Sequence, residues 1–186
     1  MSFSFVDRSD AGIKLAHALH AFADRSDVVV LALPRGGVPV AVEIARMLNA
    51  PLDVLVVRKL GVPHDPELAM GAIASGGVTF INEPFVRAYR ISPEQLSDVI
   101  AQQRVELQRR ERLYCGLREP VSIEGKTVIL VDDGIATGSS IRVALSTLRS
   151  RHAGHVVIAV PVAPENFRHE IEKAGAQFVC RIQPRI

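Results

Sequence analysis

Residues 126–145 read KTVILVDDGIATGSSIRVAL, and this stretch decides the fold. It contains an unbroken apolar run, 128–131, typical of a strand that is buried on both faces. The run ends in two adjacent acids, Asp132 and Asp133, and small or hydroxyl-bearing residues follow before a second apolar pattern with helical spacing. Ligands of open α/β sheets gather outside the carboxyl ends of the strands, so we expect a ligand site directly after this strand.

The residues after the strand suit a sugar phosphate. Two neighbouring carboxylates repel each other unless a positive or hydrogen-bonding group lies beside them, and sugar hydroxyls are such groups. The loop 134–140 leads into a helix, whose first backbone N–H groups attract a phosphate. Gly138 permits close approach of the backbone, and Thr137, Ser139 and Ser140 add hydroxyl donors. Ribose 5-phosphate therefore fits both ends of the stretch.

Competing motifs are missing from the sequence. A Walker A loop requires GxxxxGK[ST], and no lysine follows Gly138. The dinucleotide pattern GxGxxG occurs nowhere in the chain. We find no coherent Ser-His-Asp or Cys-His set, so the pattern does not indicate nucleophilic catalysis.

The rest of the chain alternates strands with helices. Apolar runs predict strands at 28–33, 52–57, 127–131, 156–160 and 177–179. Helical spacing and capping residues predict helices at 10–23, 39–48, 93–113, 139–150 and about 165–174. The Gly- and Pro-rich stretch 61–77, followed by a short strand at 78–81, predicts a hairpin. This alternation predicts an α/β fold with a mostly parallel sheet that helices cover on both faces.

Composition narrows the class of protein. The chain has 186 residues, which suits a single domain, and 48% hydrophobic with 23% charged residues is typical of a globular protein. A formal charge of +2 gives no electrostatic reason to expect a nucleic-acid or membrane-surface partner. Cys115 and Cys180 stand in no CxxC or zinc spacing. We therefore expect a soluble cytoplasmic chain.

Four stretches resemble one family. VILVDDGIATGSS, at 128–140, closely resembles the phosphoribosyl diphosphate (PRPP) signature of type I phosphoribosyltransferases. LALPRGGVPVAVEIA, at 31–45, resembles the family's pyrophosphate loop. VVRKLGVPHDPELAMGAIASGG, at 56–77, and FVDRSDAGIKLAHAL, at 5–19, are similar to a branch of the family whose base substrate is unassigned. The resemblance covers most of the chain and implies the type I phosphoribosyltransferase fold, with a parallel central sheet, flanking helices and a small hairpin or hood region.

The resemblance also implies roles for individual residues. Asp132 and Asp133 would bind the ribose hydroxyls and would be the catalytic acids. The ribose and 5-phosphate site would comprise these acids and the loop Gly134, Ile135, Ala136, Thr137, Gly138, Ser139 and Ser140.

The pyrophosphate contacts are implied in the same way. Arg35 would supply charge, and Gly36 and Gly37 open backbone amides. Arg58 and Lys59 would make a second pyrophosphate contact; the alternative is a surface pair whose stems cover apolar surface. Mg²⁺ would be held mainly by PRPP oxygens and water, with no direct protein ligand.

The implied activity is transfer of the 5-phosphoribosyl group from PRPP to a nitrogenous base, with release of pyrophosphate, in nucleotide metabolism or salvage. The implied partners are these small molecules and a second copy of the chain in a homodimer. One alternative is a regulatory protein that binds PRPP or a nucleotide on the same fold with little or no transferase activity. Another is a carrier of a different sugar phosphate. The sequence names no base.

The C-terminus departs from the family pattern. Relatives continue past the point that matches 177–180 with a segment that helps close the base pocket, whereas this chain ends six residues after Cys180. We therefore expect one phosphoribosyltransferase domain, 1–186, with a short C-terminus and an incomplete wall at the base pocket.

Overall fold

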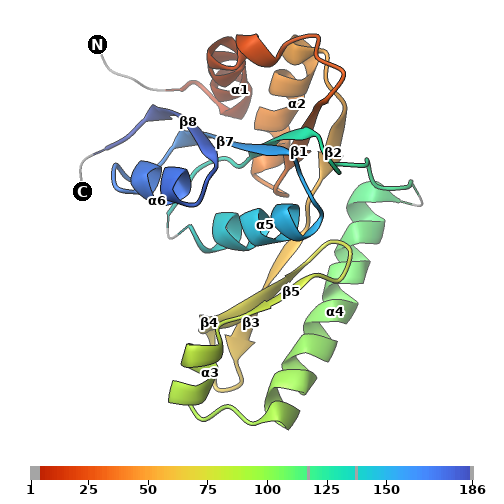
Figure 1. Cartoon of the computed structure of the whole chain (residues 1–186), viewed down its shortest axis with the longest axis vertical. Helices are drawn as coiled ribbons and strands as arrows, with labels where there is room; N and C mark the ends of the chain where they lie inside the picture. Colours follow the sequence, from red (N-terminus) through yellow and green to blue (C-terminus); the bar gives the residue numbers. More distant parts are fainter. Residues whose placement is uncertain (1–4, 117, 137, 185–186) are drawn as a thin grey trace. The chain divides into compact units, whose positions relative to one another are not determined.

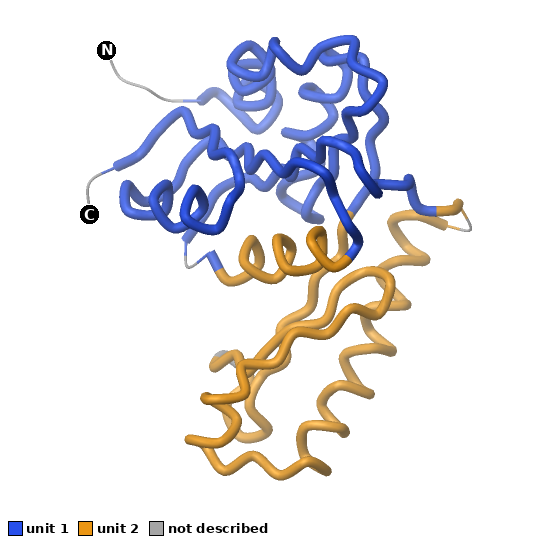
Figure 2. Tube along the Cα trace, in the orientation of Figure 1, with its two compact units in different colours: residues 1–54, 120–138, 151–186 blue, residues 55–119, 139–150 orange. Residues whose placement is uncertain are grey.

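A computed structural model of the chain describes residues 5–116, 118–136 and 138–184 (Figure 1). The chain forms two compact units, shown in blue and orange in Figure 2. Unit 1 comprises residues 1–54, 120–138 and 151–186, and unit 2 comprises residues 55–119 and 139–150. No helix in the part that the structure describes is long and apolar enough to cross a membrane.

Unit 1 is built on a five-stranded parallel sheet of order β2-β1-β6-β7-β8. Its strands are β1 (Val28–Ala32), β2 (Leu52–Val54), β6 (Thr127–Val131), β7 (His155–Val162) and β8 (Gln177–Ile182). Every residue of β1 and β6 is buried, as their unbroken apolar runs require for strands covered on both faces.

Helices cover both faces of this sheet. Helix α1 (Arg8–Ala18) and helix α2 (Gly37–Leu48) share a core cluster with the face that carries Val30 and Ile129. Helix α6 (Phe167–Lys173) packs on the opposite face (Figure 1). The Phe167 and Phe178 rings lie 6.1 Å apart there. A short 3-10 helix, η1 (His20–Phe22), follows α1. The predicted parallel sheet flanked by helices is confirmed.

The register of the sheet brings two loops together at its carboxyl edge. Val131, the last residue of β6, lies opposite Ala32, the last residue of β1. One residue further on, the Leu33 N–H donates to the Val131 carbonyl over 2.9 Å. The segments after β1 and after β6 therefore start side by side.

Unit 2 contains a three-stranded antiparallel sheet of order β3-β4-β5. Its elements are β3 (Val57–Val62), β4 (Asp65–Ala74), β5 (Thr79–Ile81), α3 (Glu83–Ala88), α4 (Pro93–Cys115) and α5 (Ser139–Ser150). Leu60, Met70, Ile73 and Leu107 form the centre of its core. The predicted hairpin is confirmed, and so is the long helix, which Ser92 and Gln95 open with a reciprocal capping box.

Two details of the prediction were wrong. The single strand expected at 52–57 is split, because β2 ends at Val54 and β3 begins at Val57 in a different sheet. Leu55 and Val56 are both buried, so the apolar run continues through the break and conceals it. Helix α3 was not predicted; the Asn82 side chain caps it by accepting from the Phe85 N–H over 3.2 Å.

Candidate active site

Asp132 and Asp133 leave the carboxyl end of β6 with both side chains half-buried. The Asp133 N–H donates to Asp132 Oδ1 over 2.8 Å. The pKa of Asp132 is raised from 3.8 to about 7, mainly by burial and in smaller part by the charge and side chain of the neighbouring Asp133, while the hydrogen bond from the Asp133 backbone lowers it. At neutral pH the pair therefore carries less than two full negative charges.

The Asp133 carboxylate has a cationic partner from the other end of the chain. Arg8, the first residue of α1, donates from Nε over 3.0 Å and from Nη2 over 2.7 Å to Asp133 Oδ2. The Arg8 side chain is 59% exposed and that of Asp133 32% exposed. No local sequence pattern could have indicated this pair, because 125 residues separate its members.

The predicted pyrophosphate loop lies against these acids. The peptide bond between Pro34 and Arg35 is cis, Arg35 is exposed, and α2 begins at Gly37. A side-chain carbon added at Gly36 would collide with the Asp133 carboxylate, and one added at Gly37 would lie 2.6 Å from the Val131 carbonyl oxygen. The structure therefore brings Arg35, Gly36 and Gly37 together with the acid pair at one edge of the unit 1 sheet.

Substitution by alanine is expected to affect stability differently at Gly36 and at Gly37. Gly36 has φ −61°, so Gly36→Ala adds no backbone strain; the carbon meets only a side chain, and the fold is expected to survive with Asp133 displaced. Gly37→Ala meets backbone, and overpacking of this kind costs about 1–3 kcal/mol. Thermal unfolding should show Gly37→Ala well below Gly36→Ala in melting temperature. Equal melting temperatures would contradict the close packing at Gly37.

The predicted phosphate loop is anchored in unit 1. Ile135 is buried, and its N–H donates to the Val162 carbonyl over 2.9 Å. Gly138 has φ +72°, and a side-chain carbon there would collide with the Phe167 ring. A side-chain carbon added at Gly134 would make ordinary contact with the Val162 carbonyl oxygen at 3.5 Å. Ala136 is exposed, and Thr137 lies outside the described residues.

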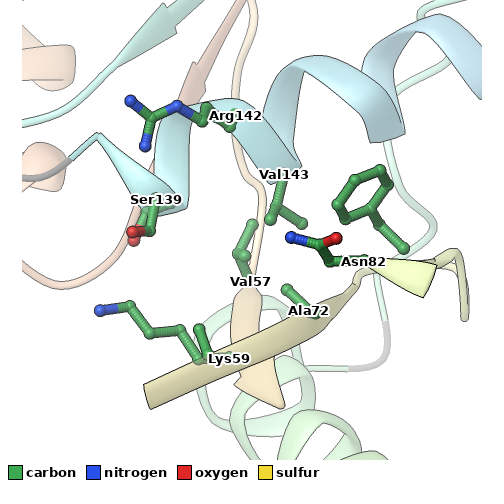
Figure 3. A pocket seen from close by; sticks show the side chains of 11 residues that line it. Val57, Lys59, Ala72, Asn82, Ser139, Arg142 and Val143 are labelled. Carbon is green, nitrogen blue, oxygen red and sulfur yellow. The ribbon is translucent and has the colours of Figure 1, made fainter. Parts of the chain in front are cut away.

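The loop continues into unit 2, where Ser139 and Ser140 open α5. Both serines border a pocket of about 190 Å³ between α5 and the strands of unit 2. Figure 3 shows the charged ends of Lys59 and Arg142 on the same side of this pocket as Ser139, with Asn82 at the other end. Two cations and hydroxyl donors beside small apolar residues make this pocket suited to an anion.

The structure places the side chains of Arg58 and Lys59 on opposite faces of β3. Successive side chains of a strand point to opposite faces, and on β3 the Lys59 side chain lines the pocket while Arg58 points to α4. Arg58 donates from Nε over 3.0 Å and from Nη2 over 2.8 Å to Gln103 Oε1. Burial lowers the pKa of Arg58, and the charge of Arg110 lowers it further. These contacts give Arg58 a role in packing within unit 2.

Three polar residues of the site and the pocket were not predicted: Arg8, Asn82 and Arg142. Arg142 could have been found, because it lies three residues after Ser139 on the same face of α5. Within residues 5–116, 118–136 and 138–184, no group of three or more His, Cys, Asp or Glu side chains is arranged to hold a metal ion.

Solved structures share this fold. The protein TT1426 from Thermus thermophilus aligns with a TM-score of 0.83 and 41% identity, covering 98% of this chain and 86% of that one. A hypothetical protein from Neisseria gonorrhoeae with bound ppGpp aligns with a TM-score of 0.55 and 14% identity, covering 98% of this chain and 82% of that one. At 14% identity the likeness concerns the fold alone.

Sequence comparison identifies the family. A Mycobacterium tuberculosis protein that carries the provisional name phosphoribosyl transferase is 44% identical over 182 residues, which are 98% of this chain and 41% of that protein. The chain thus spans about two fifths of the length of the curated relatives it matches. The family model described as the phosphoribosyl transferase domain matches residues 7–180. The chain therefore belongs to the phosphoribosyl transferase domain family.

Proposed function

We propose that this chain binds PRPP with Mg²⁺ and transfers the 5-phosphoribosyl group to a nitrogenous base, releasing pyrophosphate. One observation carries the proposal: the acid pair lies beside the glycine loop, Arg35 to Gly37, at one edge of the unit 1 sheet. Gly36 has no side chain there and so leaves room for the Asp133 carboxylate. This arrangement sets acceptors for sugar hydroxyls beside amides and a guanidinium for a diphosphate. Family membership supports the same chemistry.

The ribose end of the ligand would lie on the acids. Asp132 and Asp133 would accept hydrogen bonds from the 2- and 3-hydroxyls and so orient the sugar. Because Arg8 is paired with Asp133 and burial favours a proton on Asp132, the acids would repel an anionic ligand less than two free carboxylates would.

The phosphate ends would lie on the two loops. The 5-phosphate would take the amides of the segment 134–140 and the hydroxyls of Ser139 and Ser140 at the start of α5. Arg35 and the amides of Gly36 and Gly37 would take the diphosphate. Lys59, which lines the pocket that the serines border, would supply a further positive charge.

The reaction needs positioning and charge stabilisation from these residues. A base nitrogen forms a bond to the sugar C1 as the bond from C1 to the diphosphate oxygen breaks. Pyrophosphate leaves with the electron pair, and the base nitrogen gives up its proton to water. Positive charge grows on the ribose ring and negative charge on the leaving group, where Arg35 and the loop amides would stabilise it. No covalent intermediate with the enzyme is required.

The oxygen donors of this site fit Mg²⁺. The ion prefers hard oxygen ligands and keeps several waters, and the carboxylates of Asp132 and Asp133 would accept hydrogen bonds from those waters. Together with PRPP, it would neutralise part of the ligand's charge.

A regulatory protein that binds PRPP or a nucleotide on this fold is the second candidate. The specific observation in its favour is that a solved protein of the same fold holds ppGpp. Both candidates predict an anionic ligand at the same edge, and only the first predicts turnover. We also expect a homodimer in the cytoplasm.

One experiment separates the candidates. Calorimetry with PRPP and Mg²⁺ should show binding to the purified chain, and a panel of purine, pyrimidine and related bases should then be assayed for released pyrophosphate. Turnover with one base supports the transferase; binding without turnover of any base supports the regulator. Absence of PRPP binding would remove the transferase and leave only a regulator that binds a nucleotide.

The two basic residues of β3 give a matched pair of variants. Lys59→Gln removes a charge at the pocket and is expected to weaken PRPP binding about fivefold to tenfold, with little change in melting temperature because Lys59 is exposed. Arg58→Gln removes the hydrogen bonds to Gln103 and is expected to lower stability by about 1 kcal/mol, with affinity changed less than about twofold. If Arg58→Gln weakened PRPP binding and Lys59→Gln did not, Arg58 and not Lys59 would contact the ligand.

A further inference from the structure

Hydrogen bonds of the residues before and after Arg8 fix the backbone at the start of α1. The Asp7 side chain caps α1 by accepting from the Asp10 N–H over 2.8 Å. The Val6 N–H donates to Asp10 Oδ2 over 3.0 Å. The start of α1 is therefore fixed, and with it the point from which the Arg8 side chain reaches Asp133.

The Asp133 carboxylate lies between two partners. Both Arg8 donors meet Oδ2, at 3.0 and 2.7 Å, and the carboxylate rests against Gly36, where a side-chain carbon would collide with it. A carboxylate has about four lone-pair sites, so Asp133 Oδ1 can still accept a ligand hydroxyl. Arg8 thus fixes the rotamer of Asp133 and leaves an acceptor open.

This ion pair differs from other exposed pairs in unit 1. Lys14 pairs with Asp10 and Arg46 with Glu43, in each case within one helix. Exposed pairs of that kind contribute little to stability. The pair of Arg8 with Asp133 instead joins α1 to the segment after β6, at the edge where the glycine loop and the acids meet.

We propose that Arg8 is a positioning residue for the ribose end of the site, which it serves by orienting the Asp133 carboxylate and compensating its charge. The proposal rests on the proposed function, because the ligand is taken to be PRPP. Arg8 acts through Asp133 and makes no ligand contact of its own.

A double-mutant cycle tests this role. Affinity for PRPP with Mg²⁺ is measured by calorimetry for the parent, Arg8→Gln, Asp133→Asn and the double variant. Arg8→Gln is expected to weaken binding about threefold to tenfold in the parent and less than about twofold in the Asp133→Asn background. Arg8→Lys should recover part of the loss, because an ammonium keeps the charge and lacks the planar fork.

Arg46→Gln is the matched control. Arg46 is also an exposed arginine in an ion pair, 68% exposed against 59% for Arg8, and the same charge is lost, so affinity should not change. Circular dichroism should show both glutamine variants folded, since neither side chain is buried.

The other outcomes overturn the assignment. An equal loss in both backgrounds would make Arg8 a direct ligand contact, and tighter binding would make it a competitor of the ligand. An unchanged affinity would leave a plain surface ion pair. Each of these leaves the proposed function intact, whereas a parent that does not bind PRPP removes that function and this inference together.

Discussion

Asp132→Asn is expected to weaken PRPP binding about tenfold to hundredfold and at the same time to stabilise the chain above pH 7. A hydrogen bond to a charged group contributes about 1.5–3 kcal/mol, which gives the loss in affinity. The stabilisation follows from the pKa of Asp132, which burial raises from 3.8 to about 7. Asparagine keeps the oxygen that accepts from the Asp133 N–H, so the local fold should persist.

The sign of the pH effect is set by proton uptake. Between pH 4 and 7 the folded chain holds a proton on Asp132 that the unfolded chain has released, so this group lowers stability as pH rises through that window. Asparagine cannot ionise and avoids this loss. One pKa unit corresponds to about 1.4 kcal/mol, so the full shift would give about 4 kcal/mol. Because Asp132 is only half-buried and solvent screens its charge, we expect Asp132→Asn to gain about 1–3 kcal/mol over the parent at pH 8. At pH 4 the two should be nearly equal.

Asp27→Asn is the control for charge removal. Asp27 precedes β1 at the opposite edge of the sheet and pairs with Arg25, so its loss should leave PRPP affinity unchanged. Unchanged affinity in both Asp132→Asn and Asp133→Asn would contradict the ribose assignment. A stability difference at pH 8 no larger than at pH 4 would contradict the buried, protonated Asp132.

The part of the site that follows from sequence is local in the chain. A run of buried residues that ends in Asp132 and Asp133 must place them at a strand's end, and the same logic applies to the loop after β1. Both loops could be predicted because strand, loop and helix follow one another within about 20 residues in an α/β unit.

Long-range pairing could not be predicted in this way. Arg8 meets Asp133 across 125 residues, and only the packing of α1 on the sheet brings them together. The side chain directions of Arg58 and Lys59 are an intermediate case. Strand alternation alone indicates that two successive residues cannot serve the same site, but only the position of α4 decides which of them is turned away.

Gly138 has structural reasons to be glycine that differ from the one the sequence suggested. The sequence suggested that glycine is needed so that a phosphate can approach the backbone. The structure adds a left-handed φ of +72° and a buried neighbour, because a side-chain carbon would collide with the Phe167 ring. The contact with Phe167 cannot be predicted from the sequence TGSS, since Phe167 lies in α6 on a later segment of the chain.

Gly138→Val is therefore expected to have the largest effect of any single substitution in the loop. A left-handed backbone costs about 1–2 kcal/mol for an ordinary residue and more for a β-branched one, and displacing the Phe167 ring adds about 1–3 kcal/mol. The loop should leave its position, and binding of ribose 5-phosphate should fall more than about a hundredfold. Ser140→Ala removes one hydroxyl and should weaken binding only about fivefold.

Folding and binding can be separated in this variant. Affinity for ribose 5-phosphate is measured by calorimetry at a low temperature at which circular dichroism shows Gly138→Val to be folded, and stability is measured by urea unfolding. Phe167→Leu provides a second cycle, because a smaller side chain makes room for the added carbon; Gly138→Ala should cost less stability in that background than in the parent. The strain from φ +72° remains in both backgrounds, so the rescue should be partial. If Gly138→Val were instead protected against heat by ribose 5-phosphate as well as the parent is, the loop would not be the phosphate site.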